Sequence, residues 1–366
     1  MSYFPLKERL SKVDIRTAAV SPESYEVSPE LEGKLRPLAA EISRARERGS
    51  QVICAFGAHA IKNGLGPLLG EMLRKGWFTH LASNGAAVIH DWELSWLGKT
   101  SEDVRENVAA GRFGTWEETG LYINLALASG AWEGLGYAAS VGAMIVNEGI
   151  NIPERGELLD AVSAAKEGRG VEKAAAALDF YELIEGQMIP GTKVLGTNVP
   201  SGFLSIPHPF KKYSLLAAAR EMDKPFTCHP MFGHDIIYTH EANRGAVIGR
   251  TAERDFLEYV ANVANLEGGV YLSVGSAIMS PMIFEKALSM ARNAAGQSNA
   301  IRNCGIYVAD LQEANWDWSQ GEPPMDNPAY YLRFMKTFNR MGCRANYLTA
   351  DNREFFVGLY RLLAGR

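Results

Sequence analysis

A repeated order of short apolar run, glycine turn and helix is the feature of this sequence that most constrains its fold. A β-rich run at residues 51–56 ends at Gly57, and a helical stretch over 67–75 follows it. A second apolar run at 78–82 ends in a Ser-Asn-Gly turn at 83–85. This order is typical of a parallel sheet, because consecutive parallel strands are joined through crossover helices. The sequence therefore predicts an α/β fold with a mostly parallel sheet and helices on both faces.

The same order resumes after a helical and loop insertion, rich in alanine, at about 105–220. Four further strands are expected there. In such sheets ligands gather at the carboxyl ends of the strands, where the turns lie. The strands are expected at 224–228, 269–274, 303–309 and 347–350.

The domain organisation follows from where these elements begin. Residues 1–35 are polar and broken by prolines, so we expect an extended arm. Residues 36–366 are expected to form a single α/β nucleotide-binding domain, because no linker divides them. We expect a helix over 37–48, with Pro37 in its first turn, and a long loop, rich in glycine and proline, over 186–210.

Composition and charge exclude several partners. The formal net charge is −5 over 366 residues, without a basic block, which argues against nucleic acid. The N-terminus lacks the charged start and apolar run of a signal peptide, and no stretch of about 18 apolar residues is free of charge. We therefore expect a soluble, cytoplasmic protein without a membrane span.

The four cysteines are scattered and include no C-x-x-C pair. That spacing predicts neither a disulfide framework nor a zinc knuckle. Cys54 and Cys304 lie in apolar, strand-like runs, so buried free thiols are expected at both positions.

Three glycine turns follow predicted strands, at 57–59, 83–87 and 275–277. Small residues at such turns let backbone amides approach a phosphate or a sugar, and the following helix presents its positive end. A single turn is weak support, but three in one sheet predict a nucleotide or a phosphorylated ligand. The chain has no G-x-x-x-x-G-K-[ST] loop, which argues against an ATPase or GTPase.

Histidines near predicted strand ends are the candidate acid–base groups, because imidazole titrates near neutral pH. His90 follows the second glycine turn, and His234, Asp235 and His240 follow the strand at 224–228. We expect acid–base roles for His90 and His240. The same four residues are credible metal ligands, but their spacing matches no H-E-x-x-H or comparable motif, so no metal is predicted.

Other titratable groups have structural interpretations. His80 and His208 are expected to be structural or surface residues. Lys286 lies in the second turn of a helix expected from Pro281, where a lysine is usually solvated. Three hydrophobic residues precede Glu285, however, and a mostly buried helix would lower the pKa of Lys286 and make its amine a nucleophile.

Five segments, in the same order, resemble deoxyhypusine synthase. They are GAHAIKNG at 57–64, HLASNGAAVIHD at 80–91, the strand and loop at 226–240, VYLSVGSAIMSP at 270–281 and YLTADN at 347–352. The resemblance implies a Rossmann-like sheet with bound NAD, and a homotetramer with paired active sites. In that family NAD takes a hydride from spermidine, and a butylamine unit then passes through an enzyme lysine to a lysine of a translation factor.

The resemblance also implies roles for matched positions. The residues that would touch the dinucleotide are Gly57, Ala58, His59, Lys62, Ser83, Asn84, Gly85, Asp235 and Asp351. Asp351 suits that role chemically too, because a carboxylate after a strand can accept hydrogen bonds from ribose or adenine. The residues expected to bind the substrate are Asp91, His234, Gly275 and Ser276.

The chain departs from the family where the substrate would bind. Acids that hold the cationic polyamine are replaced by Ile89, His90 and, nearby, His240, which removes the charges that would hold an ammonium group. The G-S-D-S-G-A-x-P-D-E run of the family reads GSAIMSPMIF here, at 275–284, so further acids are missing.

These features predict an NAD-dependent transferase or oxidoreductase that abstracts a hydride from a small, neutral or anionic substrate. The catalytic lysine of the family would align with Ser289. Lys286, one helical turn earlier, is therefore the candidate for imine-mediated group transfer. The open alternatives are strict deoxyhypusine synthase activity on a protein substrate, a non-catalytic nucleotide-binding sensor, and a histidine-dependent metal hydrolase.

Overall fold

The computed structural model describes residues 1–185, 201–296, 301–314 and 316–365, and the chain divides into two compact units. The first unit comprises 1–15, 88–221 and 230–255, and the second unit comprises 16–87, 222–229 and 256–366. Boundaries between the units fall within α1 (Ile15–Ala18), α5 (Gly85–Leu97) and α12 (Gly245–Val263). The predicted arm and single domain stay predictions, since a compact unit is not by itself an independently folding domain.

A six-stranded parallel sheet forms the centre of the second unit. All six strands overlap runs predicted from the sequence, so the α/β fold with a mostly parallel sheet is confirmed. The strands are β2 (Val52–Phe56), β3 (His80–Ser83), β7 (Phe226–Cys228), β8 (Val270–Val274), β9 (Gly305–Asp310) and β10 (Arg344–Thr349). The helices wholly within this unit are α2 (Pro29–Glu47), α3 (His59–Lys62), α4 (Gly66–Arg74), α13 (Met279–Ala295), α14 (Arg333–Asn339) and α15 (Asn352–Leu363).

The strands are arranged in space in the order β7-β3-β2-β8-β9-β10. Numbered by their succession along the chain, they follow the order 3-2-1-4-5-6 that is typical of dinucleotide-binding sheets. The order reverses between β2 and β8: the chain moves outward from β2 to β3 and β7, and then returns to place β8 on the other side of β2.

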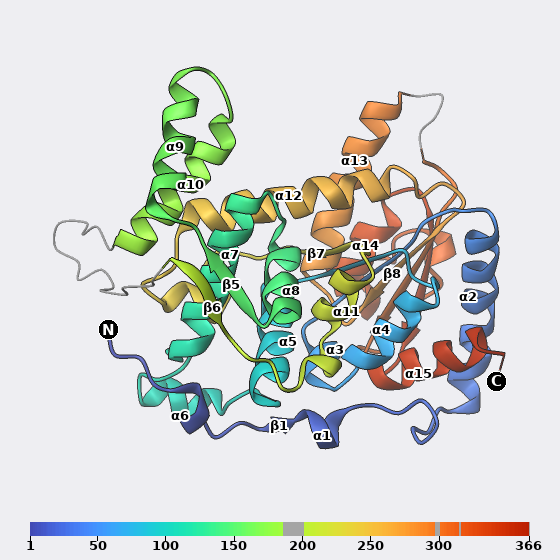
Figure 1. Ribbon diagram of the computed structural model, residues 1–366. Helices are drawn as coiled ribbons and strands as arrows, with labels where there is room; N and C mark the ends of the chain where they lie inside the picture. Colours follow the sequence, from blue (N-terminus) through green and yellow to red (C-terminus); the bar gives the residue numbers. More distant parts are fainter. Residues whose placement is uncertain (186–200, 297–300, 315, 366) are drawn as a thin grey trace. The chain divides into compact units, whose positions relative to one another are not determined.

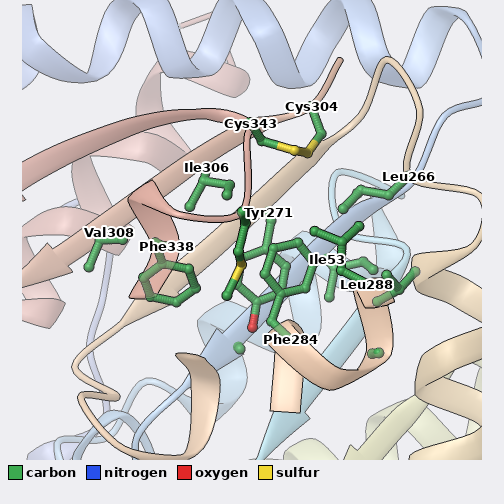
Figure 2. Close-up of a cluster of buried hydrophobic side chains, with 14 of the residues drawn as sticks. Ile53, Leu266, Tyr271, Phe284, Leu288, Cys304, Ile306, Val308, Phe338 and Cys343 are labelled. Atoms are coloured by element: carbon green, nitrogen blue, oxygen red, sulfur yellow. A yellow bond between two sulfur atoms is a disulfide. The ribbon is translucent and has the colours of Figure 1, made fainter. Parts of the chain in front are cut away.

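One face of this sheet carries a core of aromatic and aliphatic side chains (Figure 2). Tyr271 of β8 stacks on Phe284 of α13, with ring centroids 3.8 Å apart, and Phe338 of α14 lies against both rings. Ile53 of β2 and Ile306 of β9 belong to the same cluster. Because side chains alternate along a strand, the residues between these point to the opposite face.

The opposite face is covered by α2 and α15, which pack together (Figure 1). Tyr307, next to Ile306 in β9, donates its hydroxyl hydrogen bond to Glu41 of α2. Helices therefore cover both faces, as the sequence predicted.

Helix α2 begins at Pro29 and not at Pro37, which corrects the predicted start. Ser28 is its N-cap, and the Ser28 Oγ accepts a hydrogen bond from the backbone N–H of Leu31 at 3.3 Å. Pro37 consequently lies inside the helix, beyond its first turn.

Cys304 and Cys343 form a disulfide with Cα atoms 5.5 Å apart, which corrects the expectation of a free thiol at Cys304 (Figure 2). The two cysteines directly precede β9 and β10, whose parallel register pairs Gly305 with Arg344. Strand pairing thus brings together two cysteines that are 39 positions apart, and cysteine spacing alone does not reveal this. Cys54 is a buried free thiol, as expected.

The first unit is mainly helical, with two small antiparallel ladders. Its helices are α6 (Val104–Ala109), α7 (Glu117–Glu133), α8 (Tyr137–Asn147), α9 (Arg155–Lys166), α10 (Val171–Glu185) and α11 (Leu215–Glu221). The ladders pair β1 (Val13–Asp14) with β4 (Lys99–Thr100), and β5 (Gly149–Ile152) with β6 (Gly202–Ser205). The strand β6 corrects part of the predicted loop at 186–210, of which residues 186–200 lie outside the described residues.

The sequence led us to expect no membrane span. Within the described residues, no helix is both long enough and apolar enough to cross a bilayer.

Candidate functional site

The strand order places a candidate ligand site at the carboxyl edge of the six-stranded sheet. In open α/β sheets, ligands bind outside the carboxyl ends of the strands, where the strand order reverses. Here that point lies between β2, which ends at Phe56, and β8, which ends at Val274. The turns after these strands begin with Gly57 and Gly275, both of which are predicted site residues.

Gly57 and Gly275 approach each other through their backbones. The N–H of Gly57 donates to the carbonyl oxygen of Val274 at 3.0 Å, and that of Gly275 donates to Ala309 at 2.8 Å. A Cβ added to Gly57 would lie 2.0 Å from the carbonyl oxygen of Gly275, so a larger residue does not fit. Gly275 has a φ of +58°, and no described atom lies within 4 Å of where its Cβ would be. Exposed backbone at Gly275 is thus open to a ligand.

The turn after β3 is tied to the end of β2. The Ser83 hydroxyl donates to the carbonyl oxygen of Phe56 at 2.7 Å. The Asn84 Oδ1 accepts a hydrogen bond from the N–H of Ala87 at 3.0 Å and so caps the start of α5 at Gly85. Three predicted cofactor residues therefore form one hydrogen-bonded turn at the sheet edge, and their contact with a dinucleotide stays a prediction.

Ala58, His59 and Lys62 continue from the turn after β2 into the short helix α3. The N–H of Lys62 donates to the carbonyl oxygen of Ala58 at 3.1 Å. His59 is exposed, whereas Ala58 and Lys62 are half-buried. These residues place one ammonium group and one imidazole near the first glycine turn.

Two further predicted residues at this edge accept hydrogen bonds from the first turns of helices. The Ser276 Oγ accepts from the N–H of Ser280 at 3.2 Å, at the start of α13. Asp351 is the N-cap of α15, and its Oδ1 accepts from the backbone N–H and the Nε of Arg353 at 2.9 and 3.1 Å. Burial alone would raise the pKa of Asp351, but the hydrogen bonds and charge of Arg353 hold it below its ordinary value. The Asp-x-x-Glu pattern from Asp351 to Glu354 is the sequence signal of such a cap.

Lys286 lies on the exposed face of α13, so the mostly buried helix expected around it is wrong. Phe284, Ala287 and Leu288 form the buried face of the helix. The side chain of Lys286 is 50% exposed, and its Nζ forms an ion pair with Glu285. A role for Lys286 in imine formation stays a prediction that burial does not support.

His229 also lies at the sheet edge, directly after β7, and is not among the predicted site residues. Its backbone N–H donates to the carbonyl oxygen of Ser83 at 2.8 Å. Its Nε2 lies 3.0 Å from the Oγ1 of Thr227. The one signal that could have identified His229 is its position as the first residue after a predicted strand.

His90, the main acid–base candidate, belongs to the first unit and to a buried chain of hydrogen bonds. Its Nδ1 lies 2.7 Å from the Oγ1 of Thr100, and that hydroxyl donates to Glu93 at 2.5 Å. Thr100 has one hydroxyl hydrogen and gives it to Glu93, so it accepts a hydrogen bond from His90. The Nδ1 of His90 therefore carries a hydrogen, and Nε2 is the ring nitrogen that remains to gain or lose a proton.

Glu93 keeps its charge although it is buried. Burial alone would raise its pKa, but the guanidinium of Arg9, the nearby ring of His90 and the hydroxyl of Thr100 hold the pKa of Glu93 below its usual value. Arg9 donates to both carboxylate oxygens, at 2.8 and 2.7 Å, and Thr119 donates at 3.0 Å. Glu93 lies three residues after His90, on the same face of α5, which is the signal that could have linked them.

Asp91 is engaged as the cap of α11. Its carboxylate accepts hydrogen bonds from the hydroxyl of Ser214 and from the backbone N–H groups of Leu215 and Leu216. Asp91 is buried, and burial raises its pKa to about 6. These bonds give Asp91 a structural role, and its expected contact with substrate stays a prediction.

His240 is a buried and neutral imidazole. Its Nδ1 accepts from the N–H of Ala242 at 3.1 Å, so the ring hydrogen lies on Nε2, which is 3.7 Å from the Glu117 Oε2. The ring lies against that of Tyr3, with centroids 4.4 Å apart. Burial lowers the pKa of His240 to about 4, so at neutral pH it carries no charge.

Asp235 is buried, whereas its neighbour His234 is exposed. The hydroxyl of Tyr238 donates to the Asp235 carboxylate at 3.2 Å, and burial raises the pKa of Asp235 to about 6. Among the residues that the structure describes, no group of three histidine, cysteine or acidic side chains is placed to hold a metal ion.

Apart from Lys286, which lies on α13 of the second unit, the predicted residues fall into two sets. One set follows the strands of the second unit, and the other belongs to the first unit. The first set is Gly57, Ala58, His59, Lys62, Ser83, Asn84, Gly85, Gly275, Ser276 and Asp351. The other is His90, Asp91, His234, Asp235 and His240.

Comparison with known proteins gives likeness at the level of the backbone only. No family model and no curated protein matches the chain. The apo structure of ArgZ, a cyanobacterial arginine dihydrolase, is 13% identical with a TM-score of 0.44, over 93% of this chain and 32% of that one. AgrE in complex with ornithine and NAD+ is 15% identical with a TM-score of 0.43, over 93% of this chain and 34% of that one.

A conserved LOR/SDH protein from Methanococcus maripaludis S2 is 13% identical with a TM-score of 0.42, over 94% of this chain and 74% of that one. The chain therefore spans about a third of the length of ArgZ and AgrE. The fold assignment rests on the strand order and not on these likenesses.

Proposed function

We propose that this chain binds NAD at the carboxyl edge of the six-stranded sheet and is an enzyme of the deoxyhypusine synthase type. The observation that carries the proposal is the 3-2-1-4-5-6 strand order, with Gly57 and Gly275 in backbone contact where that order reverses. A dinucleotide needs such a place, because backbone amides must come close to its pyrophosphate and sugars. Bound NAD would supply the hydride acceptor.

The side chains at this edge fit a dinucleotide in their chemistry. Lys62 offers a positive charge to a phosphate. The N–H of Gly275 is already donated to Ala309, but its exposed backbone leaves room for a ligand because no side chain is in the way. Asp351 is ionised at neutral pH, so it can accept hydrogen bonds from ribose hydroxyls. Ser83 and Asn84 complete the neighbouring turn.

The acid–base role is assigned to His90, with His240 as the alternative. In the Nδ1–H tautomer, the Nε2 of His90 can take a proton, and the charge of Glu93 stabilises the imidazolium through Thr100. A base oriented by a third group is the usual arrangement for proton transfer in enzymes. Lys286 is retained as the candidate for imine-mediated transfer.

The substrate is proposed to be small and neutral or anionic, and not spermidine. Ile89, His90 and His240 stand where acids of the family hold ammonium groups, and His240 is neutral as well as buried. Strict deoxyhypusine synthase activity on a protein substrate is the second candidate. A homotetramer in the cytoplasm belongs to the same proposal and is supported by the resemblance alone.

Calorimetry with NAD tests the cofactor, and NADH formation with amines, amino acids, hydroxy acids and spermidine tests the reaction. We expect NAD to bind and NADH to form with a neutral or anionic substrate. Equal turnover of spermidine would support strict deoxyhypusine synthase activity. NAD binding without turnover, with equal affinity in His90→Ala and His240→Ala, would support a sensor. A chain that binds no NAD contradicts the proposal.

A further inference from the structure

Two buried histidines of the second unit are joined through one threonine hydroxyl. The His80 Nε2 lies 2.9 Å from the Oγ1 of Thr227, and the His229 Nε2 lies 3.0 Å from the same oxygen. His80 belongs to β3 and is fully buried, Thr227 belongs to β7, and His229 is the first residue after β7. The hydrogen-bonded series His80, Thr227, His229 therefore extends from the interior of the sheet to its carboxyl edge.

A single hydroxyl hydrogen couples the tautomers of the two rings. If Thr227 donates that hydrogen to His229, it must accept a hydrogen bond from His80; if it donates to His80, it must accept from His229. In the first arrangement the Nδ1 of His229 carries a hydrogen, and in the second it carries a lone pair. The tautomer of His80 therefore decides whether the Nδ1 of His229 donates or accepts a hydrogen bond.

Both imidazoles are neutral in the folded chain. Burial lowers the pKa of each ring to about 3, and for His229 the nearby His80 adds to the effect. The edge of Tyr259 contacts both rings, with centroids 5.5 Å from His80 and 5.0 Å from His229. A ring held in this way does not act as a base at neutral pH, but it offers a fixed hydrogen bond to an uncharged polar group.

The position of His229 selects which part of a dinucleotide it would meet. It is bonded through its N–H to Ser83, so it lies at the ends of the second and third strands of the sheet. In sheets of this order, the first half of the strands binds the adenosine part, and an acid after the second strand holds the ribose hydroxyls. Here that strand ends at Ser83, whose hydroxyl is bonded to Phe56, and Asn84 follows it. The turn at 83–87 contains no acid.

We propose that His229 takes the place of that acid and hydrogen-bonds, through Nδ1, to the adenosine ribose, with Thr227 and His80 as positioning residues. This inference rests on the proposed NAD site and adds one contact to it, between His229 and a ribose hydroxyl group. It also explains why a threonine and a second histidine are buried beneath His229, where aliphatic side chains would fill the same space.

The test compares the affinities of wild type and Thr227→Val for NAD, ADP-ribose and nicotinamide mononucleotide by calorimetry. We expect Thr227→Val to bind NAD and ADP-ribose about tenfold more weakly, as one misplaced hydrogen bond would cause. Nicotinamide mononucleotide, which lacks the adenosine part, should bind with unchanged affinity. Thr227→Ser keeps the hydroxyl and should bind all three within about twofold of wild type.

Thr251→Val is the matched control, because Thr251 is equally buried and its hydroxyl donates within α12. If Thr227→Val and Thr251→Val bind NAD equally well, the inference is overturned while the NAD site stands. A wild-type chain that binds none of the three ligands overturns both.

Ring 15N spectra of the wild-type chain keep the inference testable if Thr227→Val does not fold. The chain has seven histidines, so their ring signals can be assigned by substitution. ADP-ribose should shift the ring nitrogens of His229 and, through Thr227, those of the buried His80. Saturating ADP-ribose that leaves both rings unshifted contradicts the inference.

Discussion

A Cβ at Gly57 would lie 2.0 Å from the carbonyl oxygen of Gly275, so the first and fourth strands of the sheet meet through bare backbone. This contact arises because β2 and β8 are neighbours in register up to their last residues, Phe56 and Val274. Each strand is then followed by a glycine, at which the backbone turns out of the sheet. Gly57 permits the close approach of the two backbones, and Gly275 permits a positive φ at the turn after β8.

Gly57→Ala should disrupt this edge. The added methyl group cannot be relieved by a flexible side chain, because it meets a backbone carbonyl oxygen, so we expect destabilisation by about 3 kcal/mol. NAD binding should be lost in parallel. Urea unfolding and calorimetry with NAD measure the two effects.

Gly33→Ala is the control for that substitution. Gly33 lies in α2 with nothing within 4 Å of where its Cβ would be, so alanine there should stabilise the helix by up to about 1 kcal/mol. Gly57→Ala with the stability and NAD affinity of wild type would show that the close contact of the two turns is not required.

Thr100→Val should release the ring of His90. The substitution removes the hydroxyl that accepts from the His90 Nδ1 and donates to Glu93. We expect ring 15N shifts of His90 that report a single Nδ1–H tautomer in wild type and in Thr100→Ser, and a mixture of tautomers in Thr100→Val. Proton transfer by His90 should fall by at least about tenfold, as the loss of an oriented base implies.

The same experiment separates orientation from stability. Arg9 and Thr119 still hold Glu93 in Thr100→Val, so the buried ion pair should survive and the chain should stay folded. If the His90 signals are identical in all three proteins, Thr100 does not set the tautomer.

Removing the disulfide should destabilise the second unit. Cys304 and Cys343 close a loop with a sequence separation of 39, and the chain-entropy argument gives about 4 kcal/mol for a loop of this length. The double variant Cys304→Ser with Cys343→Ser should therefore unfold at lower urea concentration than wild type under oxidising conditions. Under reducing conditions the difference should largely vanish.

Cys54→Ser is the comparison for the disulfide variant, because Cys54 is a buried thiol outside the bond. Its effect should be the same with and without reductant. Equal midpoints for wild type with and without reductant would show that the bond contributes nothing to stability.

The strands could be predicted because each is a short, continuous apolar run that ends at a turn. β2 and β8 are buried on both faces, so β2 is apolar throughout and β8 is apolar apart from Ser273, and a glycine follows each strand. The order of the strands and the contact of Gly57 with Gly275 then depend on pairing between distant segments, which periodicity does not encode.

The parts of the site that sequence reasoning missed depend on long-range contacts. Arg9 reaches Glu93 across 84 positions, and His80 reaches Thr227 across 147. A sequence shows which groups can titrate but not which are desolvated together. Lys286 illustrates the converse error: three apolar residues before Glu285 suggested burial, but only one face of α13 is buried.

Acid should destabilise the second unit through His80 and His229. The pKa of each is lowered from 6.5 to about 3, so between these values the unfolded chain binds protons that the folded chain does not. Their contribution to stability is therefore complete above pH 6.5 and is lost as the pH falls towards 3. In His80→Asn one of the two titrations is removed, so the urea midpoint should fall less between pH 7 and pH 5 than in wild type.

Groups of the first unit act in both senses. Burial lowers the pKa values of His208 and His240 to about 4, so these two rings add to the loss of stability in acid. The pKa values of Asp91 and Asp235 are raised from 3.8 to about 6, so between those values the folded chain binds more protons and is stabilised as the pH falls. If His80→Asn shows the same fall as wild type, the ring of His80 is not held neutral by burial, and the coupling of the two histidines through Thr227 loses its basis.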